Sequence, residues 1–247
     1  MSLNFFKGQI RKLSEDFDIT LISSPDKELK QIAHSENVKY TAISMKRDIA
    51  LKDDVLSLLR FLWLFIWQRP DIIHCNTPKG SLLGLFTGYI TRVPVRIYYV
   101  HGLRYEGTTG KKRKLLMALE KLNCFCATHI IAVSQGVKQK VQDKLTRKKV
   151  SVIHHGSANG MPLEEFLTEN YDGAAIRESY GITKQDFVFG FVGRLVADKG
   201  INELVHAFST LEQKNVKLLL VGMYEHELDP LSQETQNIIK TNPNIVE

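Results

Sequence analysis

The sequence predicts an α/β protein in which parallel strands alternate with helices. Short apolar runs of strand length recur through the first 160 residues, and segments of helical length separate them. A further apolar run with a helical pattern behind it begins at residue 187. Such alternation is typical of a Rossmann-like parallel sheet covered by helices. We therefore expect a Rossmann-like domain over residues 1–160, a linker with one helix over 161–186, and the beginning of a second Rossmann-like domain over 187–247.

The first domain is expected to contain six strands. Each is a short run rich in β-branched or aromatic residues, and they lie at Asp18–Ser23, Tyr40–Ile43, Asp71–Cys75, Val95–Val100, His129–Val133 and Lys149–His154. Ligands of open parallel sheets bind beyond the carboxyl ends of the strands. The turns that follow these strands are therefore the candidate walls of a site.

Two helices of the first domain are predicted at Lys27–Glu36 and Asp53–Gln68. The second contains Val55–Trp67 (VLSLLRFLWLFIW), which is apolar nearly all round. This segment includes Arg60 and is shorter than the roughly 20 apolar residues that a bilayer-spanning helix needs. A core helix and a helix that contacts a membrane surface both fit the pattern.

The second domain is expected to open with a strand, a turn and a helix. Phe187–Val192 has the length and composition of a buried strand, and apolar residues at helical spacing follow in Ile201–Phe208. Another strand is expected in Lys217–Gly222. Ahead of this domain, the helix of the linker is predicted at Ala174–Tyr180.

The turn between that strand and that helix carries two cations. Gly193 and Gly200 permit close backbone approach, while Arg194 and Lys199 lie beside a helix start whose free amides favour anions. A diphosphate suits this arrangement. An ordinary turn with two solvated cations has the same spacing, so the spacing alone leaves both interpretations open.

The segment Gly190–Phe208 (GFVGRLVADKGINELVHAF), followed by KLLLVG at Lys217–Gly222, resembles part of the family 4 glycosyltransferases, which have the GT-B fold. The resemblance implies that Arg194 and Lys199 are catalytic and, with Gly193, bind the diphosphate of a nucleotide sugar donor. It also implies that the sugar is transferred, with retention of configuration, to a glycan or polyprenyl diphosphate-linked acceptor. Relatives with this pattern assemble bacterial surface polysaccharides such as capsule and lipopolysaccharide.

The same resemblance implies further site residues in the first domain. His101, at the exit of the strand Val95–Val100, resembles the family's histidine that contacts the donor sugar and is predicted to be catalytic. A lone histidine is more often structural, so the sequence position alone does not decide its role. The opening segment SLNFFKGQ resembles the family's glycine loop, which makes Gly8 a candidate donor-binding residue.

Four polar residues in two turns are candidates for the acceptor side of the site. Thr77 and Lys79 lie in the turn NTPKGS, at the start of a predicted helix, where they can bind phosphate or sugar hydroxyls. A capped helix start has the same composition. Arg104 and Glu106 lie in the turn that begins with His101.

No metal or organic cofactor is expected. The two cations and the helix amides can stabilise the negative charge that develops on the leaving diphosphate, which removes the need for a metal ion. The three cysteines, Cys75, Cys124 and Cys126, are an odd set without metal-ligand spacing. We see no signal peptide, so we expect a cytoplasmic protein with reduced thiols.

Charge is distributed unevenly along the chain. Residues 1–160 contain 26 Lys and Arg against 13 Asp and Glu, whereas residues 161–247 contain 7 against 14. No nucleic-acid-binding motif accompanies the basic half, so the expected partners are a nucleotide sugar and a glycan or lipid-linked acceptor. The run Lys111–Lys114 is a candidate contact with the inner face of the plasma membrane, or else a solvated basic face.

Family 4 enzymes are considerably longer than this chain. The family's first strand and its later pair of glutamates have no counterpart in the sequence, so the resemblance implies a fragment that is inactive alone. Two other classes of protein stay open. A GT-B-type nucleotide-sugar epimerase would need acid/base groups at its crevice, and a binding fragment without activity would need none.

Overall fold

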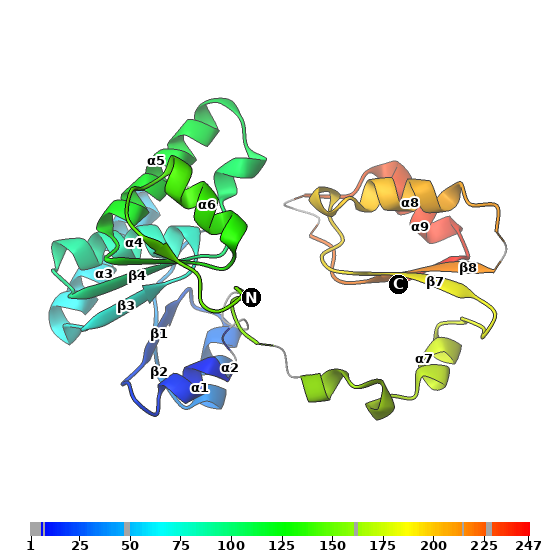
Figure 1. Cartoon of the computed structure of the whole chain (residues 1–247), viewed down its shortest axis with the longest axis horizontal. Coiled ribbons are helices and arrows are strands. Elements are labelled where there is room, and N and C mark those ends of the chain that lie inside the picture. The colour runs from blue at the N-terminus through cyan, green and yellow to red at the C-terminus, as the bar shows by residue number, and fades with distance from the viewer. Residues whose placement is uncertain (1–5, 7, 47–49, 161–162, 214, 226–228) are drawn as a thin grey trace. The chain divides into compact units, whose positions relative to one another are not determined.

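The computed structural model describes residues 6, 8–46, 50–160, 163–213, 215–225 and 229–247. The chain divides into two compact units, Met1–Met161 and Pro162–Glu247 (Figure 1). The strand pairs described in both units are parallel, and helices connect the strands. The predicted α/β class with parallel sheets is confirmed.

The first unit alternates strands and helices along its whole length. Its elements are α1 (Gln9–Leu13), β1 (Thr20–Ser23), α2 (Lys27–Glu36), β2 (Lys39–Ala42), α3 (Leu51–Gln68), β3 (Ile72–Cys75), α4 (Pro78–Ile90), β4 (Val95–Val100), the 3₁₀ turn η2 (Arg104–Gly107), α5 (Gly110–Cys126), β5 (His129–Ala132), α6 (Gln135–Lys144) and β6 (Val150–Ser151). All six strands predicted from the sequence are present. The last is much shorter than predicted, because the chain turns away at His154, which has a positive φ of 47°.

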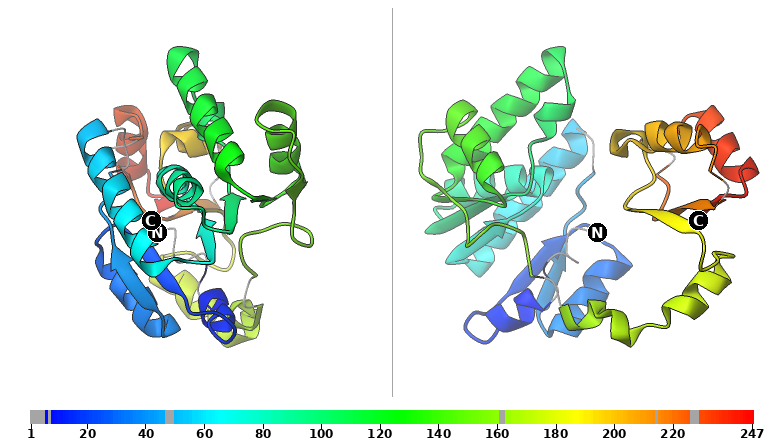
Figure 2. Two further views of the ribbon diagram at one scale, coloured as in Figure 1. Left: turned by 90° about the vertical axis from the view of Figure 1, so that its left-hand side faces the viewer. Right: turned by 45° about the vertical axis from the view of Figure 1, so that its right-hand side comes forward.

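The strands of the first unit form two parallel sheets. One has the order β3-β4-β5-β6 and the other consists of β1 and β2. Helices α3, α4 and α5 pack beside one another on the larger sheet, as two views of the ribbon show (Figure 2). Leu21 of the small sheet and Tyr99 of the large one belong to one apolar cluster, which joins the two sheets.

Side chains close several helix ends of this unit. The side chains of Asp26, Thr77 and Ser134 accept hydrogen bonds from the first-turn amides of α2, α4 and α6. At the carboxyl end of α5, Lys148 Nζ donates to the carbonyls of residues 124, 125 and 127 at 2.7–3.0 Å. These polar and basic side chains thus satisfy backbone amides and carbonyls at the helix ends.

The three cysteines are free thiols, as expected from their number and spacing. Cys124 and Cys126 are buried in the main core with Val100 and Ile130. Burial raises the pKa of the Cys124 thiol to about 12, so the neutral form is maintained at physiological pH. These cysteines act as small apolar packing residues.

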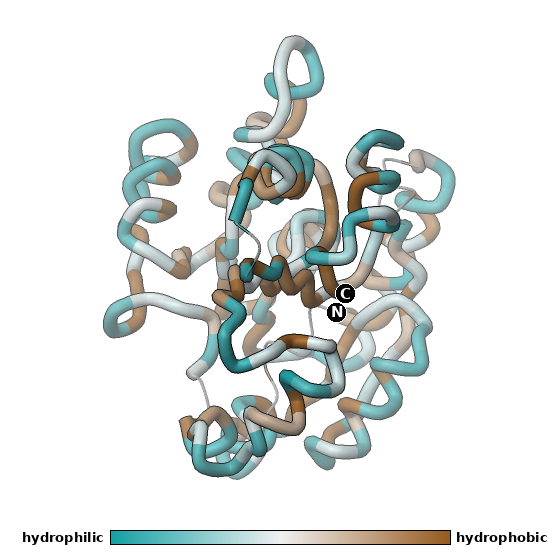
Figure 3. The backbone as a smooth tube through the Cα atoms, turned by 90° about the vertical axis from the view of Figure 1, so that its right-hand side faces the viewer, coloured by the Kyte–Doolittle hydropathy of each residue, from teal (hydrophilic) through white to brown (hydrophobic). Residues whose placement is uncertain are grey.

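The second unit contains a smaller parallel sheet with the order β7-β8-β9. Its elements are η3 (Leu163–Phe166), η4 (Thr168–Asn170), α7 (Gly173–Ser179), β7 (Phe187–Val192), η5 (Ala197–Lys199), α8 (Ile201–Ser209), β8 (Val216–Val221), α9 (Gln233–Thr241) and β9 (Ile245–Val246). Brown, hydrophobic stretches alternate with teal, hydrophilic ones along the trace of the chain (Figure 3). The described part of the expected linker contains the predicted helix, α7; its role as a linker stays a prediction.

None of the helices in the described residues is long and apolar enough to cross a membrane. Helix α3 is the longest helix in the described residues and is rich in apolar side chains. One of its faces enters the core through Phe61, Leu64 and Phe65, each 4–5% exposed. The core-helix interpretation is therefore right for this face, while the opposite face is exposed.

Candidate functional site

A pocket of about 370 Å³ opens at the carboxyl ends of β3 and β4 in the first unit. This is the edge of a parallel sheet at which ligands bind. The lining residues are Asn76, Pro78, Tyr98, Tyr99, Val100, His101, Gly102, Leu103 and Arg104. Two of the turns predicted as site walls therefore meet here, because the strands that precede them are neighbours in the sheet.

His101 lies in the wall of this pocket, partly buried against aromatic rings. Its ring centroid is 4.6 Å from that of Tyr99 and 5.9 Å from that of Phe6. Nε2 lies 3.4 Å from Oδ1 of Asn76, a long contact in which a protonated Nε2 donates. Burial lowers the pKa of His101 below its usual value, so the imidazole is neutral at physiological pH and can either donate to or accept from a sugar hydroxyl.

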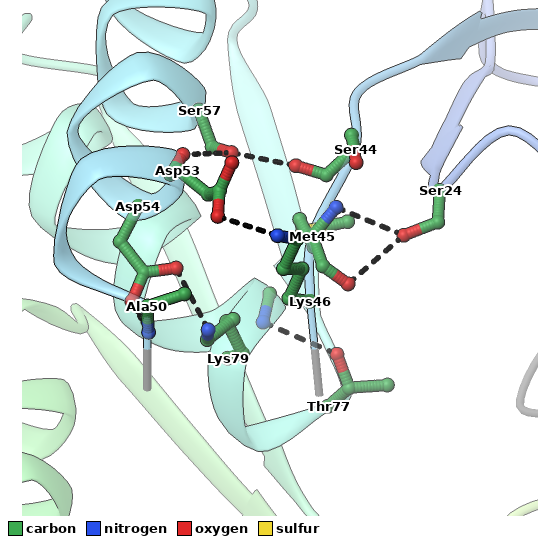
Figure 4. Close-up of polar contacts among 11 residues, drawn as sticks. Ser24, Ser44, Met45, Lys46, Ala50, Asp53, Asp54, Ser57, Thr77 and Lys79 are labelled. Atoms are coloured by element: carbon green, nitrogen blue, oxygen red, sulfur yellow. Dashed lines mark hydrogen bonds and ion pairs between the residues drawn. The ribbon is translucent and has the colours of Figure 1, made fainter. Parts of the chain in front are cut away.

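Thr77 and Lys79 lie at the start of α4, beside the pocket. Thr77 Oγ1 accepts from the amide of Gly80 at 3.3 Å, which is the capped helix start that the composition also allowed. Lys79 Nζ forms an ion pair with Asp54 of α3 at 2.7 Å, and both side chains are largely buried (Figure 4). In this structure Lys79 therefore connects α4 to the first turn of α3.

The other two acceptor-side candidates differ in position. Arg104 is exposed and lines the pocket, as a residue that binds an anionic substrate must. Glu106 forms an ion pair with Lys140 of α6 at 2.9 Å and is not among the lining residues. The structure thus brings His101, Asn76 and Arg104 together and directs Glu106 towards a neighbouring helix.

Gly8 meets a carboxylate of its own unit. Its amide donates to both oxygens of Glu36, at 2.9 and 3.0 Å, and the amide of Arg11 donates to Oε2 at 2.8 Å. Glu36 is almost fully buried, so these amides satisfy a charge that would otherwise be costly to bury. The predicted role of Gly8 in donor binding stays a prediction, since the described amide has a partner here.

Beneath the pocket lies a buried carboxyl group that the sequence did not reveal. Glu120 of α5 is 4% exposed and accepts a hydrogen bond from the hydroxyl of Tyr98, a lining residue. Burial raises the pKa of Glu120, while the bond from Tyr98 opposes the shift. The pair fixes one wall of the pocket. The residues around Glu120 in the sequence do not mark it as buried, and only its position on the inner face of α5 separates it from the exposed acids of the chain.

The second unit contains the predicted diphosphate turn between β7 and α8. Gly193 and Arg194 follow β7, and Lys199 precedes Gly200, which has a φ of 73° and is the N-cap residue of α8. Leu195 and Val196 are buried and anchor the turn. Both cations thus belong to one short turn at the carboxyl edge of the sheet, with the side chain of Lys199 exposed.

Carboxylates from the loop after β8 contact this turn. Arg194 Nη1 donates to Glu225 Oε2 at 2.6 Å, and Nη2 lies 3.7 Å from Asp198 Oδ2. Asp229 Oδ2 accepts from the amide of Asp198 at 2.7 Å. Sequence reasoning missed Glu225 and Asp229. The signal that could have found them is the group of three acids in the segment after the predicted strand Lys217–Gly222.

The described residues contain no cluster of three or more His, Cys, Asp or Glu that could bind a metal ion. One Asp-x-Asp pattern occurs in the sequence, at Asp16 and Asp18. Both residues are exposed ahead of β1, at the edge opposite the carboxyl ends of the strands, and Asp18 pairs with Lys39 at 2.8 Å. The prediction that no metal takes part in the reaction remains untested.

Two family models match the sequence. One, described as Glycosyltransferase Family 4, matches residues 9–157, which is more than half of the chain. The other, described as Glycosyl transferases group 1, matches residues 172–242 and includes the turn with Arg194 and Lys199. The first match lies within the first structural unit and the second within the second unit.

Curated relatives point in the same direction. The chain is 39% identical to the capsular polysaccharide biosynthesis glycosyltransferase CapM of Staphylococcus aureus, across 99% of this chain and 64% of that protein. It is 30% identical to the UDP-Gal:α-D-GlcNAc-diphosphoundecaprenol α-1,3-galactosyltransferase of Escherichia coli, across 75% of this chain and 48% of that protein. The chain therefore spans less than two thirds of the length of these relatives.

Solved structures share the fold at low sequence identity. The HepE protein of Anabaena, crystallised with UDP and glucose, is 18% identical with a TM-score of 0.68, over 96% of this chain and 63% of that chain. A UDP-GlcNAc 2-epimerase from Neisseria meningitidis bound to UDP-GlcNAc is 14% identical with a TM-score of 0.63, over 99% and 68%. Transferases and epimerases thus share this architecture, and the fold by itself does not separate them.

Proposed function

The chain belongs to glycosyltransferase family 4, and on that basis we propose that the protein transfers a sugar from a nucleotide diphosphate sugar to an acceptor in bacterial capsule or related polysaccharide assembly. The observation that supports this proposal most strongly is the turn between β7 and α8, which presents Arg194 and Lys199 beside a helix start. An anion with two phosphates matches two cations and free helix amides. The relatives from S. aureus and E. coli support this reaction class through their names.

We propose distinct roles for the residues of the two units. Arg194 and Lys199 stabilise the negative charge that develops on the diphosphate as it leaves, and no metal ion is needed for this purpose. Neutral His101 hydrogen-bonds a hydroxyl of the donor sugar. Arg104, exposed in the same pocket, binds the acceptor, with Thr77 and Lys79 at its edge. Transfer proceeds with retention of configuration, as the family resemblance implies.

The acceptor that we propose is a glycan or a sugar linked to polyprenyl diphosphate at the inner face of the plasma membrane. The name of the E. coli relative describes such a lipid-linked acceptor. The predicted contact through Lys111–Lys114 is part of this proposal. Lys111, Lys112 and Lys114 are exposed at the start of α5, whereas the Arg113 guanidinium lies 5.6 Å above the ring of Tyr105.

Calorimetric titration with UDP tests the diphosphate turn. We expect binding in the micromolar to millimolar range by the unmodified chain, and loss of measurable binding in Arg194→Ala. Lys240→Ala, which removes an exposed cation from α9, is the matched control and should bind like the unmodified chain. Equal UDP affinity in Arg194→Ala would contradict the proposed donor site.

A second measurement separates the reaction classes. A transferase consumes a nucleotide sugar only when an acceptor is present, apart from slow hydrolysis. Conversion of UDP-GlcNAc to a 2-epimer without an acceptor would identify the epimerase class instead. UDP binding without turnover, with a lipid-linked acceptor supplied, would identify a binding chain.

A further inference from the structure

Helix α3 has two apolar faces, and only one of them is covered. Its exposed large apolar side chains range from 49% exposure at Leu56 to 75% at Trp67, and they are Val55, Leu56, Leu59, Trp63, Ile66 and Trp67. Scattered surface leucines are normal in a folded protein, whereas a contiguous patch that includes two tryptophans marks an interaction site. Helix α3 runs along the outside of the first unit, which leaves this face accessible within that unit (Figure 2).

The exposed residues share one side of the helix. At about 100° of rotation per residue, the six fall within a stripe on the order of 120° wide, opposite the core-facing Phe61. The rings of Trp63 and Trp67 stack one turn apart, with centroids 5.7 Å apart and an interplanar angle of 27°. This pair makes a rigid apolar surface near the carboxyl end of α3. Tryptophan is the residue most typical of the boundary between lipid and water.

Three cations lie on α3 or at its carboxyl end. Lys52, Arg60 and Arg69 are exposed, and none of them forms an ion pair within the described part of the chain. The two acids of the helix are both neutralised by lysines: Asp53 by Lys46 at 2.8 Å and Asp54 by Lys79 at 2.7 Å (Figure 4). An apolar stripe flanked by unpaired cations matches a surface that is apolar inside and negatively charged outside.

We propose that this face of α3, defined by the six residues from Val55 to Trp67, docks on an anionic lipid bilayer. The helix lies in the plane of the interface, with its apolar stripe among the acyl chains and its cations at the headgroups. The same face of a second copy does not fit here, because residues 1–160 of each copy contain 26 Lys and Arg against 13 Asp and Glu, and two basic surfaces repel each other. The same excess of cations attracts anionic lipid.

The position of α3 connects this surface to the pocket. Asp54 in its first turn is paired with Lys79 of α4, and the neighbouring Pro78 lines the pocket. The amino end of the stripe, at Val55, therefore lies near the edge at which a lipid-linked acceptor would enter. The docking itself requires no donor and no turnover, so it can be tested independently of the proposed reaction.

Tryptophan fluorescence tests the proposal directly, because the chain has two tryptophans and both belong to the docking face. Vesicles of phosphatidylglycerol and phosphatidylcholine should shift the emission to shorter wavelength, and brominated lipids should quench it. Vesicles of phosphatidylcholine alone should do so far more weakly. Unchanged emission, with no co-sedimentation on the anionic vesicles, would overturn the proposal.

Two double variants test whether α3 is the helix that binds the vesicles. Leu59→Glu combined with Ile66→Glu places two carboxylates on the stripe, keeps both tryptophans and should reduce vesicle binding at least tenfold. The matched control is Leu163→Glu with Ile176→Glu, two exposed apolar positions of the second unit, which should bind normally. Both double variants change exposed side chains, and circular dichroism checks their folding. Equal loss in both, or full binding by the α3 variant, would refute the assignment.

Two further outcomes identify other surfaces or partners. Lys52→Gln and Arg60→Gln should each lower the affinity for anionic vesicles by about fivefold, from roughly 1 kcal/mol per surface cation. Lys111→Gln with Lys112→Gln should have less effect; if instead this variant abolishes binding while the α3 variant retains it, α5 is the docking helix. A blue-shifted emission that depends on protein concentration without vesicles would show that a second copy covers the stripe, which also contradicts the proposal.

Discussion

Nη1 of Arg194 lies 2.6 Å from Oε2 of Glu225, so a cation that follows β7 is held by a carboxylate that follows β8. These strands are adjacent and parallel, and the loops after them therefore meet at one edge of the sheet. Asp198 adds a second carboxylate, 3.7 Å from Nη2. The guanidinium is thus oriented, and partly neutralised, by its own unit before any ligand binds.

This pairing predicts that Glu225 opposes the binding of anions to the turn. Glu225→Gln keeps an oxygen that can accept from Arg194 and removes the negative charge, so UDP and pyrophosphate should bind about fivefold more tightly, a change of ~1 kcal/mol. Calorimetry at low salt measures the affinities. Glu178→Gln, on the exposed surface of α7, is the control. Weaker binding by Glu225→Gln would show that the charged carboxylate is needed to hold the guanidinium in place.

The two cations of the turn should also determine the rate of sugar transfer. In the full-length protein, Arg194→Ala and Lys199→Ala should each remove about 2–4 kcal/mol of transition-state stabilisation, by analogy with the loss of one oxyanion donor. The value of kcat/KM should fall by roughly 30- to 1,000-fold. Lys240→Ala should retain the full rate. Wild-type rates in Lys199→Ala would exclude this lysine from catalysis.

His101 should titrate below the ordinary range of histidine. Burial lowers its pKa from the usual 6.5, so between these two values the unfolded chain binds a proton that the folded chain does not. This contribution to the free energy of unfolding is therefore constant above about pH 6.5 and is lost as the pH falls towards the folded pKa. NMR titration of the imidazole, assigned by its disappearance in His101→Gln, measures the pKa.

The stability of that variant provides the complementary check. Glutamine has no proton to gain over this range, so His101→Gln should lose less stability than the unmodified chain between pH 7 and pH 5. Equilibrium denaturation at both pH values gives the comparison. A midpoint for His101 at or above 6.5 would contradict the expectation.

The conformation of the turn that contains Arg194 and Lys199 should also depend on Gly222. A Cβ atom at this position would lie 1.7 Å from the carbonyl oxygen of Gly193, a backbone atom that cannot move aside easily. Gly222→Ala should therefore destabilise the second unit by at least ~1–3 kcal/mol and weaken UDP binding. Gly190→Ala, where the added methyl group meets no atom within 4 Å, should change the melting temperature little. Thermal melts of both variants make the test.

Secondary structure was largely accessible from the sequence because it depends on local pattern. The run Phe187–Val192 coincides with β7, and Lys27–Glu36 coincides with α2, since strand composition and an amphipathic period are both properties of neighbouring residues. The strand predicted at Lys149–His154 was overextended. Only Val150 and Ser151 pair with β5; the chain after them turns back so that the amide of Ser157 donates to the carbonyl oxygen of Val133.

The sequence by itself determined the fold class, the family and the turn with Arg194 and Lys199. Apolar periodicity and a compact motif depend only on residues that are close together in the sequence. The tertiary structure alone decided which distant residues meet: Glu225 with Arg194, Asp54 with Lys79, and Glu36 with Gly8. It also decided which face of α3 is covered. In a helix that is apolar nearly all round, the sequence does not indicate which side is buried, so only packing against α4 and the core leaves Trp63 and Trp67 exposed.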